Sequence, residues 1–176
     1  MKILFKLFIG GLLAYANLSQ ATGINQNKWY RIKPISQEGL CYDVSGGSDE
    51  DCTSVILYQQ CCESKNQHFK FKKAPNGNGN SYFIIARHAP TKVLDICEGS
   101  MKNRDCLILY HNLYTRGFGS YNSNQQFYVS RAGGDLFRIT NVKSSMALGF
   151  DENRNVCQML LDYSLDTVVQ LEVVDA

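Results

Sequence analysis

The chain repeats one pattern three times, and this repetition constrains its fold more than any other feature. Tyr30, Phe83 and Phe137 are spaced by 53 and 54 residues, and each lies in a short apolar segment that reaches an isoleucine two residues later. Short alternating runs of Val, Ile, Tyr and Phe, separated by Gly, Asn, Ser and Asp, predict strands and turns. A repeat of about fifty residues cannot bury its own apolar face, so three repeats must share one core. The sequence therefore predicts a single all-β domain with pseudo-threefold symmetry, with repeats at about residues 27–74, 80–131 and 135–175.

The first two repeats also share a polar pattern. Asp43 precedes Tyr58 by fifteen residues, and Asp95 precedes Tyr110 by the same number. An Asn-Gln pair follows each of these tyrosines and is itself followed by an apolar segment. The third repeat has Gly149 in place of the acid and no such pair. A hydrogen bond to a charged group contributes roughly 1.5–3 kcal/mol and a millimolar site has only about 4 kcal/mol in total, so we expect the third repeat to complete the core and bind nothing.

Residues 1–21 have the pattern of a secretory signal peptide. Lys2 and Lys6 flank an apolar run, and small-residue sites follow it at Ala14-Tyr15-Ala16 and Ser19-Gln20-Ala21. We expect cleavage at the second of these sites, with the first as the alternative, and a secreted mature domain of residues 22–176. A spanning helix needs about 20 apolar residues and this run is shorter, so we expect no membrane insertion after cleavage.

The charge of the mature chain and its motifs exclude several functions. Without the two leader lysines the sequence has sixteen basic and sixteen acidic residues, whereas nucleic acids and anionic lipid surfaces require clustered Lys and Arg. We therefore expect no nucleic-acid partner. No phosphate loop, Gly-x-Ser-x-Gly elbow or His-Glu-x-x-His helix occurs, and the cysteines and histidines lack the spacing of a zinc site. We expect neither an enzyme nor a metal or cofactor.

The pattern as a whole resembles the ricin B-chain type lectin repeat. It consists of an apolar-Asp-apolar element, a Gly-Ser turn, a strand that ends in Tyr, and a terminal Asn-Gln-x-aromatic motif. The Gln-x-Trp motif of the family appears here as Gln67-His68-Phe69 and Gln125-Gln126-Phe127, with Phe in place of Trp. The resemblance covers the mature chain and implies a β-trefoil, in which a six-stranded barrel is capped by three hairpins and each repeat can carry one shallow sugar pocket.

A pyranose presents neighbouring hydroxyls on its rim and C–H groups on one face, so its site needs a carboxylate acceptor and an aromatic ring. In repeat one Asp43 is the expected acceptor and Tyr58 the stacking ring, while an amide can both donate and accept. The resemblance places an isoleucine near the sugar and gives the glutamine an orienting role. The predicted carbohydrate-binding residues are Asp43, Ile56, Tyr58, Asn66 and Gln67 in repeat one and Asp95, Ile108, Tyr110, Asn124 and Gln125 in repeat two.

These residues predict a secreted lectin for galactose-type or N-acetylgalactosamine-type glycans, with glycans or glycoproteins of a cell surface or matrix as partners. The alternative is a non-catalytic trefoil that binds protein, such as a toxin delivery subunit or an inhibitor. The loop of residues 114–122 is peculiar to repeat two. This loop can either extend the second pocket or block it.

Seven cysteines in a secreted chain predict disulfides and leave one thiol over. The resemblance implies a bridge from Cys41 to either Cys61 or Cys62, and Cys97 and Cys106 enclose a short loop that a second bridge can close. Cys52 can then pair with the remaining member of the Cys61-Cys62 pair. Cys157 is left over and is a candidate for a disulfide to a partner chain.

Overall fold

The computed structural model describes residues 23–75, 80–118, 122–161 and 164–174. The predicted signal peptide lies outside the described residues. Within the described part of the chain, no helix is long and apolar enough to span a membrane. The regular structure consists of strands, together with short helical turns of three to five residues.

Three consecutive sets of four strands follow the three sequence repeats. The first set is β1 (Trp29–Pro34), β2 (Leu40–Val44), β3 (Thr53–Gln59) and β4 (Phe69–Lys73). The second set is β5 (Ser81–Ala86), β6 (Lys92–Ile96), β7 (Leu107–His111) and β8 (Phe127–Gly133). The third set is β9 (Leu136–Asn141), β10 (Ala147–Phe150), β11 (Val156–Met159) and β12 (Val169–Val174).

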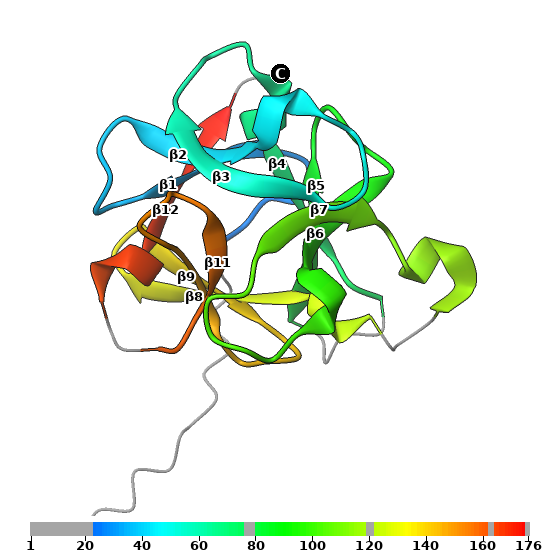
Figure 1. The fold of residues 1–176 in the computed structure, drawn as a ribbon. Coiled ribbons are helices and arrows are strands. Elements are labelled where there is room, and N and C mark those ends of the chain that lie inside the picture. The colour runs from blue at the N-terminus through cyan, green and yellow to red at the C-terminus, as the bar shows by residue number, and fades with distance from the viewer. Residues whose placement is uncertain (1–22, 76–79, 119–121, 162–163, 175–176) are drawn as a thin grey trace, which may run out of the picture.

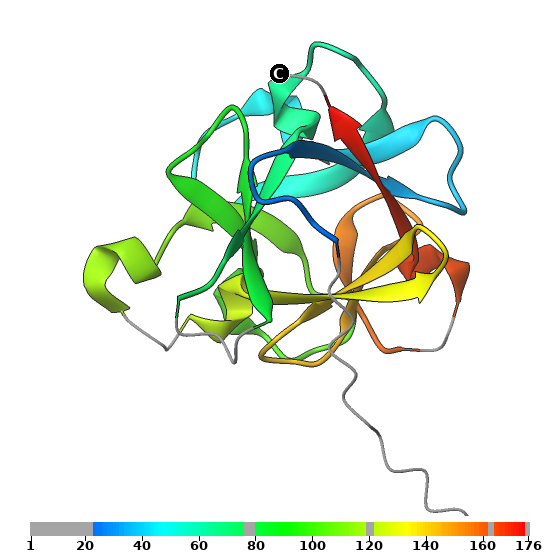
Figure 2. The same ribbon diagram turned by 180° about the vertical axis from the view of Figure 1, so that it is seen from behind.

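The first and last strands of each set close into a barrel. Hydrogen-bonded neighbours run in the order β1, β4, β5, β8, β9 and β12, and β12 pairs again with β1. The middle strands form the hairpins β2–β3, β6–β7 and β10–β11. Figure 1 shows the hairpins arranged around a common axis, and Figure 2 shows the barrel strands from behind. This arrangement confirms the predicted all-β fold and its pseudo-threefold symmetry as a β-trefoil.

The three hairpins also pair with one another in an equivalent way. Ser54 pairs with Ile108, Cys106 with Cys157, and Asn155 with Ile56. Each hairpin turn ends in a residue with positive φ before the second strand, and these residues are Cys52 (65°), Arg104 (68°) and Arg154 (67°). The pairing between hairpins therefore repeats the threefold symmetry of the barrel.

One core joins all three repeats. Alternate residues of the strands point inward, as a period of two requires, and the side chains buried most completely include the aromatic residues Tyr42, Phe69, Phe71 and Phe127. The core extends from the barrel into the hairpins through residues such as Leu57 and Leu109. The other face of each hairpin is left for polar groups, and the candidate site residues lie there.

Candidate functional site

The site in repeat one is built around a carboxylate held by two side-chain amides. Asp43 lies on β2 and is only 4% exposed. Its Oδ1 accepts from Asn66 Nδ2 at 2.9 Å, and its Oδ2 accepts from Gln67 Nε2 at 2.8 Å. The helical turn η2 (Lys65–Gln67) brings both amides to the hairpin. Gln67 is itself fixed, because it donates to the Gln59 carbonyl and accepts from the Cys61 amide.

Repeat two contains the same network at the equivalent positions. Asp95 accepts from Asn124 Nδ2 at 2.8 Å and from Gln125 Nε2 at 2.7 Å. Gln125 also donates to the His111 carbonyl and accepts from the Leu113 amide. The helical turn η6 (Ser123–Gln125) takes the place of η2. The sequence pattern therefore corresponds to one three-dimensional arrangement, built twice from residues that are 23 to 30 positions apart.

Both carboxylates are poised to accept further hydrogen bonds. Burial raises the pKa of Asp43 and of Asp95 above the ordinary aspartate value, and the hydrogen bonds from the paired amides oppose this effect. The hydrogen-bond partners of both carboxylates are amides rather than cations. A carboxylate has about four lone-pair positions, and two amide donors leave capacity for hydroxyl groups.

The isoleucine and tyrosine of each site stand on the second strand of the hairpin. Ile56 lies opposite Asp43, and Ile108 lies opposite Asp95, in the same antiparallel register. Tyr58 and Tyr110 follow two residues later and therefore share the face of the carboxylate. Tyr58 is 59% exposed, which leaves its ring free to form a stacking surface.

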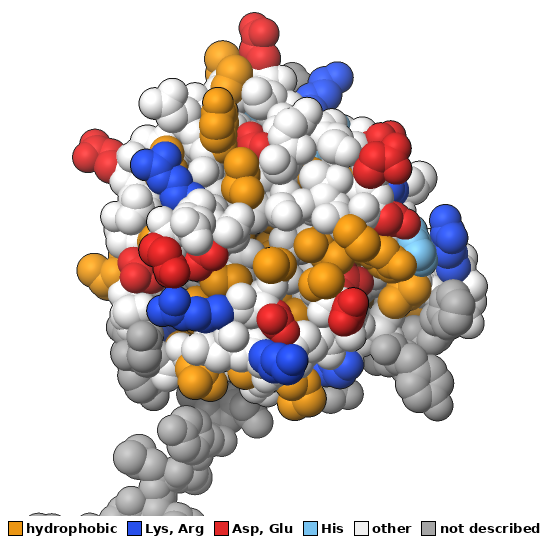
Figure 3. Space-filling model, viewed as in Figure 1, with side chains coloured by type: hydrophobic (Ala, Val, Ile, Leu, Met, Phe, Trp, Pro, Cys, Tyr) orange, Lys and Arg blue, Asp and Glu red, His pale blue; other side chains and the backbone are white. Residues whose placement is uncertain are grey.

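A hollow of about 470 Å³ marks the site in repeat two, which we call pocket two. Such a volume is within the usual range for small-ligand sites. Hydrophobic side chains gather on the right of the face in Figure 3, where β6 and β7 lie in Figure 1, with acidic side chains beside them. The hollow is lined by Cys52, Asp95, Cys97, Glu98, Gly99, Ile108, Tyr110, Leu113, Asn124 and Lys143. The equivalent site in repeat one is called pocket one.

The third repeat fills the same position with its own side chains. Gly149 stands where the acid would be, and a Cβ at Gly149 would lie 2.8 Å from Met159 Cγ and 3.5 Å from Thr167 Cγ2. In the register of the hairpins, Met159 replaces the tyrosine and Cys157 replaces the isoleucine. The turn η7 (Leu165–Thr167) places Asp166 and Thr167 where the other repeats have Asn and Gln. The third repeat has kept the backbone of a site without its chemistry.

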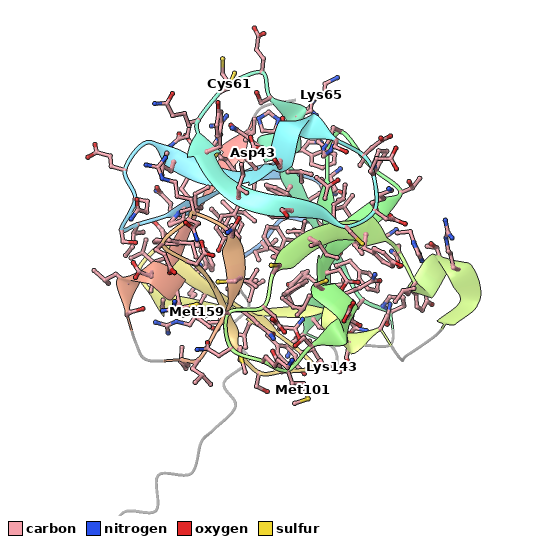
Figure 4. The ribbon with its side chains drawn as sticks, in the orientation of Figure 1. Asp43, Cys61, Lys65, Met101, Lys143 and Met159 are labelled. Atoms are coloured by element: carbon pink, nitrogen blue, oxygen red, sulfur yellow. The ribbon has the colours of Figure 1, made fainter. Side chains whose placement is uncertain are left out.

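The site position of each repeat is also bordered by a residue from the following repeat. The sequence analysis did not identify these three residues. Ser36 donates to Asp166 at 2.8 Å, and His88 Nε2 lies 3.0 Å from the Ser48 carbonyl beside pocket one. Lys143 takes the corresponding place at pocket two, where a Cβ on Gly99 would lie 2.7 Å from its Nζ. Figure 4 shows Asp43 in the upper part of the molecule and Lys143 in the lower part. Ser36, His88 and Lys143 share a position shortly after the first strand of their repeats, and this was the only signal for them in the sequence.

The loop peculiar to repeat two begins by turning away from pocket two. Tyr114 packs against Phe83, with ring centroids 6.1 Å apart, and joins a small cluster with Val93. His111 pairs with Asp51 of the neighbouring hairpin at 2.8 Å and contacts the Tyr110 ring. The end of the loop includes residues 119–121, which lie outside the described residues.

The predicted disulfides are not formed in this structure, where all seven cysteines are free thiols. Cys41 is buried on β2, whereas Cys61 and Cys62 are exposed. The guanidinium of Arg31 lies near Cys41 and donates to the Cys61 carbonyl. Arg31 therefore contacts the segment that carries Cys61, and the thiols of Cys41, Cys61 and Cys62 are free. Cys52 lies apart from this region, at the wall of pocket two.

The other two cysteine predictions have different outcomes. Cys97 donates its amide to the Cys106 carbonyl at 3.1 Å, so these residues lie opposite each other as a bridge requires, although their thiols are free. The predicted disulfide from Cys157 to a partner chain has no support in this structure, because Cys157 is only 1% exposed and its backbone forms a β-bridge with Cys106 in the hairpin cap. Burial also raises the pKa of the Cys157 thiol to about 12, which suppresses the reactive thiolate.

Comparison with known sequences identifies the family. The sequence model described as "Ricin-type beta-trefoil lectin domain-like" matches residues 18–110, which is more than half of the chain. The protein therefore belongs to the ricin-type β-trefoil lectin domain-like family. Domains of this lectin type are generally non-catalytic. A search among curated proteins finds no match.

Solved structures show the same fold at low sequence identity. The designed threefold-symmetric protein ThreeFoil has a TM-score of 0.71 and 24% identity, covering 84% of this chain and 99% of its own. A mosquitocidal holotoxin has a TM-score of 0.72 and 18% identity over 86% of this chain, which corresponds to 18% of the toxin chain. The Polyporus squamosus lectin has a TM-score of 0.66 and 12% identity, covering 82% of this chain and 48% of its own. These similarities establish the β-trefoil.

Proposed function

We propose that the protein is a secreted lectin that binds galactose-type or N-acetylgalactosamine-type sugars through pockets one and two. The observation that carries the proposal is the duplicated network, in which Asp43 and Asp95 are each held by an Asn-Gln pair with distances of 2.7–2.9 Å. Core packing does not require a buried carboxylate, because burying one is costly unless it is paired with hydrogen-bond donors. Two such carboxylates, each beside a tyrosine, are what sugar hydroxyls and a sugar face need.

The family supports this proposal in general terms, because lectin-like trefoils bind glycans. One structural neighbour, the Polyporus squamosus lectin, was solved with the epitope Neu5Acα2-6Galβ1-4GlcNAc bound. Two pockets on one chain also favour glycans with several branches, since linked weak sites gain affinity through effective concentration. The leader-like residues 1–21 support the secretion part of the proposal.

The test measures retention of the mature chain on a galactose matrix and calorimetric binding of galactose and N-acetylgalactosamine. Asp43→Ala and Asp95→Ala are made singly and together, and Asp166→Ala in repeat three is the matched control. We expect each single variant to lose one site and the double variant to lose retention, while the control binds normally. Retention of a folded double variant at the level of the unmodified protein would overturn the proposal.

A protein partner is the alternative outcome. A stoichiometric complex with one protein that free galactose does not dissolve, formed equally by the double variant, would show that this trefoil binds protein instead of sugar. Such a complex would then be mapped to the loop around Tyr114, which is peculiar to repeat two.

A further inference from the structure

Two cations lie close to the ring of the only tryptophan of the chain. Trp29 begins β1, and Lys70 on β4 places its ammonium 4.3 Å from the centre of the Trp29 ring. The guanidinium of Arg87, just after β5, lies 5.6 Å from the same ring. His68 lies between Arg87 and Arg31, and we call these five residues the Trp29 cluster.

The positive charges of the cluster exceed its negative charges. Arg31 is 8% exposed and pairs with Glu172 at 3.2 Å, while its buried Nε has no partner. Glu172 is shared with Lys33 at 3.4 Å. Within the described part of the chain, no carboxylate lies within ion-pair distance of Lys70 or Arg87. A buried or half-buried group of like charges is costly unless an anion compensates it.

The contacts of His68 also indicate that the cluster lacks a negatively charged acceptor. One ring nitrogen lies 3.5 Å from Arg31 Nη2 and the other lies 3.5 Å from Arg87 Nη1. A neutral imidazole accepts at only one of its two nitrogens, so its other N–H must face a guanidinium donor. Burial lowers the pKa of His68, and the two arginines lower it further. An added anion would accept hydrogen bonds from the guanidinium groups of Arg31 and Arg87, which at present face the His68 ring.

The cluster is connected to pocket one through two short segments. The amide of Cys61 donates to Gln67, which holds Asp43, and the carbonyl of the same residue accepts from Arg31. Arg87 is followed directly by His88, which borders pocket one. Pocket one and the cluster are therefore neighbours at Cys61 and at the Arg87–His88 pair.

We propose that the Trp29 cluster is an anion subsite beside pocket one, and that it binds a sulfate or carboxylate group carried by an acidic oligosaccharide. Trp29 holds the two outer cations in place through cation–π contacts, so their positions are fixed before the ligand arrives. Guanidinium and ammonium groups together suit either acid, since arginine pairs with planar or tetrahedral anions in a bidentate way. The glycan part of this proposal rests on the proposed function, whereas the anion site itself does not.

The test uses the fluorescence of Trp29 as a reporter inside the site. Inorganic sulfate, a heparin-derived sulfated tetrasaccharide, 3′-sialyllactose and neutral lactose are each titrated into the full mature chain. We expect a saturable change in emission with the sulfated tetrasaccharide or with sialyllactose, and none with lactose. The first result assigns sulfate and the second assigns carboxylate as the preferred group. No saturable change with any of the three anionic probes would overturn the proposal.

Variants separate a built site from general attraction by charge. Arg87→Gln and Lys70→Gln should each weaken the anionic probe about tenfold, the effect of losing one charge-assisted hydrogen bond. Arg116→Gln and Lys102→Gln remove the same charge at exposed positions elsewhere and should leave the affinity unchanged. Equal losses in all four variants would contradict a specific subsite. Circular dichroism confirms that each variant is folded.

Two further variants make the failure of this proposal distinguishable from the failure of the proposed function. Asp43→Asn removes the carboxylate of pocket one and should leave the response of Trp29 to inorganic sulfate intact, whether or not pocket one binds sugar. A chain shortened by Asp175 and Ala176 tests competition, because these residues follow Val174, which pairs with Trp29. We expect the full-length chain and the shortened chain to bind the anion with the same affinity. Binding that occurs only in the shortened chain would show that the cluster serves the carboxylates of its own terminus.

Discussion

Repeats one and two keep a carboxylate in a network of amides, whereas repeat three fills the same place with Met159 and Thr167. All three repeats nevertheless form the same hairpin, the same helical turn and the same pairing at the cap. The backbone of a trefoil repeat is therefore set by its apolar residues and turns. In the proposed function, sugar binding depends on a few polar side chains placed on that backbone, and repeat three keeps the fold without them.

The largest difference between the repeats should appear when the central amide is removed. Gln67→Ala leaves Asp43, the Gln59 carbonyl and the Cys61 amide without their shared partner, in a position only 1% exposed. We expect a loss of about 3 kcal/mol in the free energy of unfolding, because buried polar groups lose their hydrogen bonds. Urea denaturation measures this loss.

The matched variant is Thr167→Ala in repeat three. Thr167 accepts from Arg138 at 3.2 Å and donates to the Ser164 carbonyl at 3.1 Å, so fewer bonds are lost and none involves a buried carboxylate. We expect a loss of about 1 kcal/mol in the free energy of unfolding. If the two variants were destabilised equally, the amide network would not distinguish the repeats.

A smaller effect is expected when the filled site of repeat three is overpacked. Gly149→Ala places a Cβ at 2.8 Å from Met159 Cγ, closer than contact distance. We expect a loss of about 1–2 kcal/mol, measured by thermal unfolding. Adding Met159→Ala should recover part of the loss from the clash. Failure of this second change to recover any stability would show that Met159 does not fill the position.

Acidification should weaken sugar binding before it affects the fold. Burial raises the pKa of Asp43 and Asp95, so both carboxyls take up protons at a pH above the ordinary aspartate value of about 3.9 and lose acceptor capacity. Because the folded pKa exceeds the unfolded value, stability from these two groups increases as the pH falls through this window. We expect the affinity for galactose to fall as the pH is lowered from 7 toward the ordinary aspartate range, measured by calorimetry. An affinity that stayed constant while circular dichroism showed a folded chain would contradict ionised acceptors.

The smallest effects should distinguish pockets one and two from each other. Lys143→Ala should weaken galactose binding about two- to threefold at pocket two, since an exposed charge contributes at most about 1 kcal/mol. His88→Ala should have a similar effect confined to pocket one. Each is measured in the background of Asp95→Ala or Asp43→Ala, which leaves a single pocket. A loss at both pockets from either variant would show that these residues do not act locally.

The sequence predicted most of the fold and the inner part of the site. The repeated spacing could be recognised because the barrel and hairpins require the same order of four strands in every repeat, and Asp43, Asn66 and Gln67 lie within one repeat. His88 and Lys143 were missed because they reach each site from the following repeat, so their distance in sequence hides their contact.

Two other features could not be predicted from composition or spacing. The neutral charge of the mature sequence conceals the Trp29 cluster, because a balanced total says nothing about where Arg31 and Arg87 meet. The burial of Cys157 could not be predicted either, since it depends on the pairing of two hairpins from different repeats. Both features arise from contacts between repeats.

Side-chain amide signals in nuclear magnetic resonance test the central claim most directly. On titration with galactose, the amide signals of Asn66 and Gln67 should shift as one set and those of Asn124 and Gln125 as a second set, while the backbone amide of Thr167 stays in place. Unchanged signals for both sets at saturating sugar, or a shift of Thr167 as large as theirs, would contradict the account.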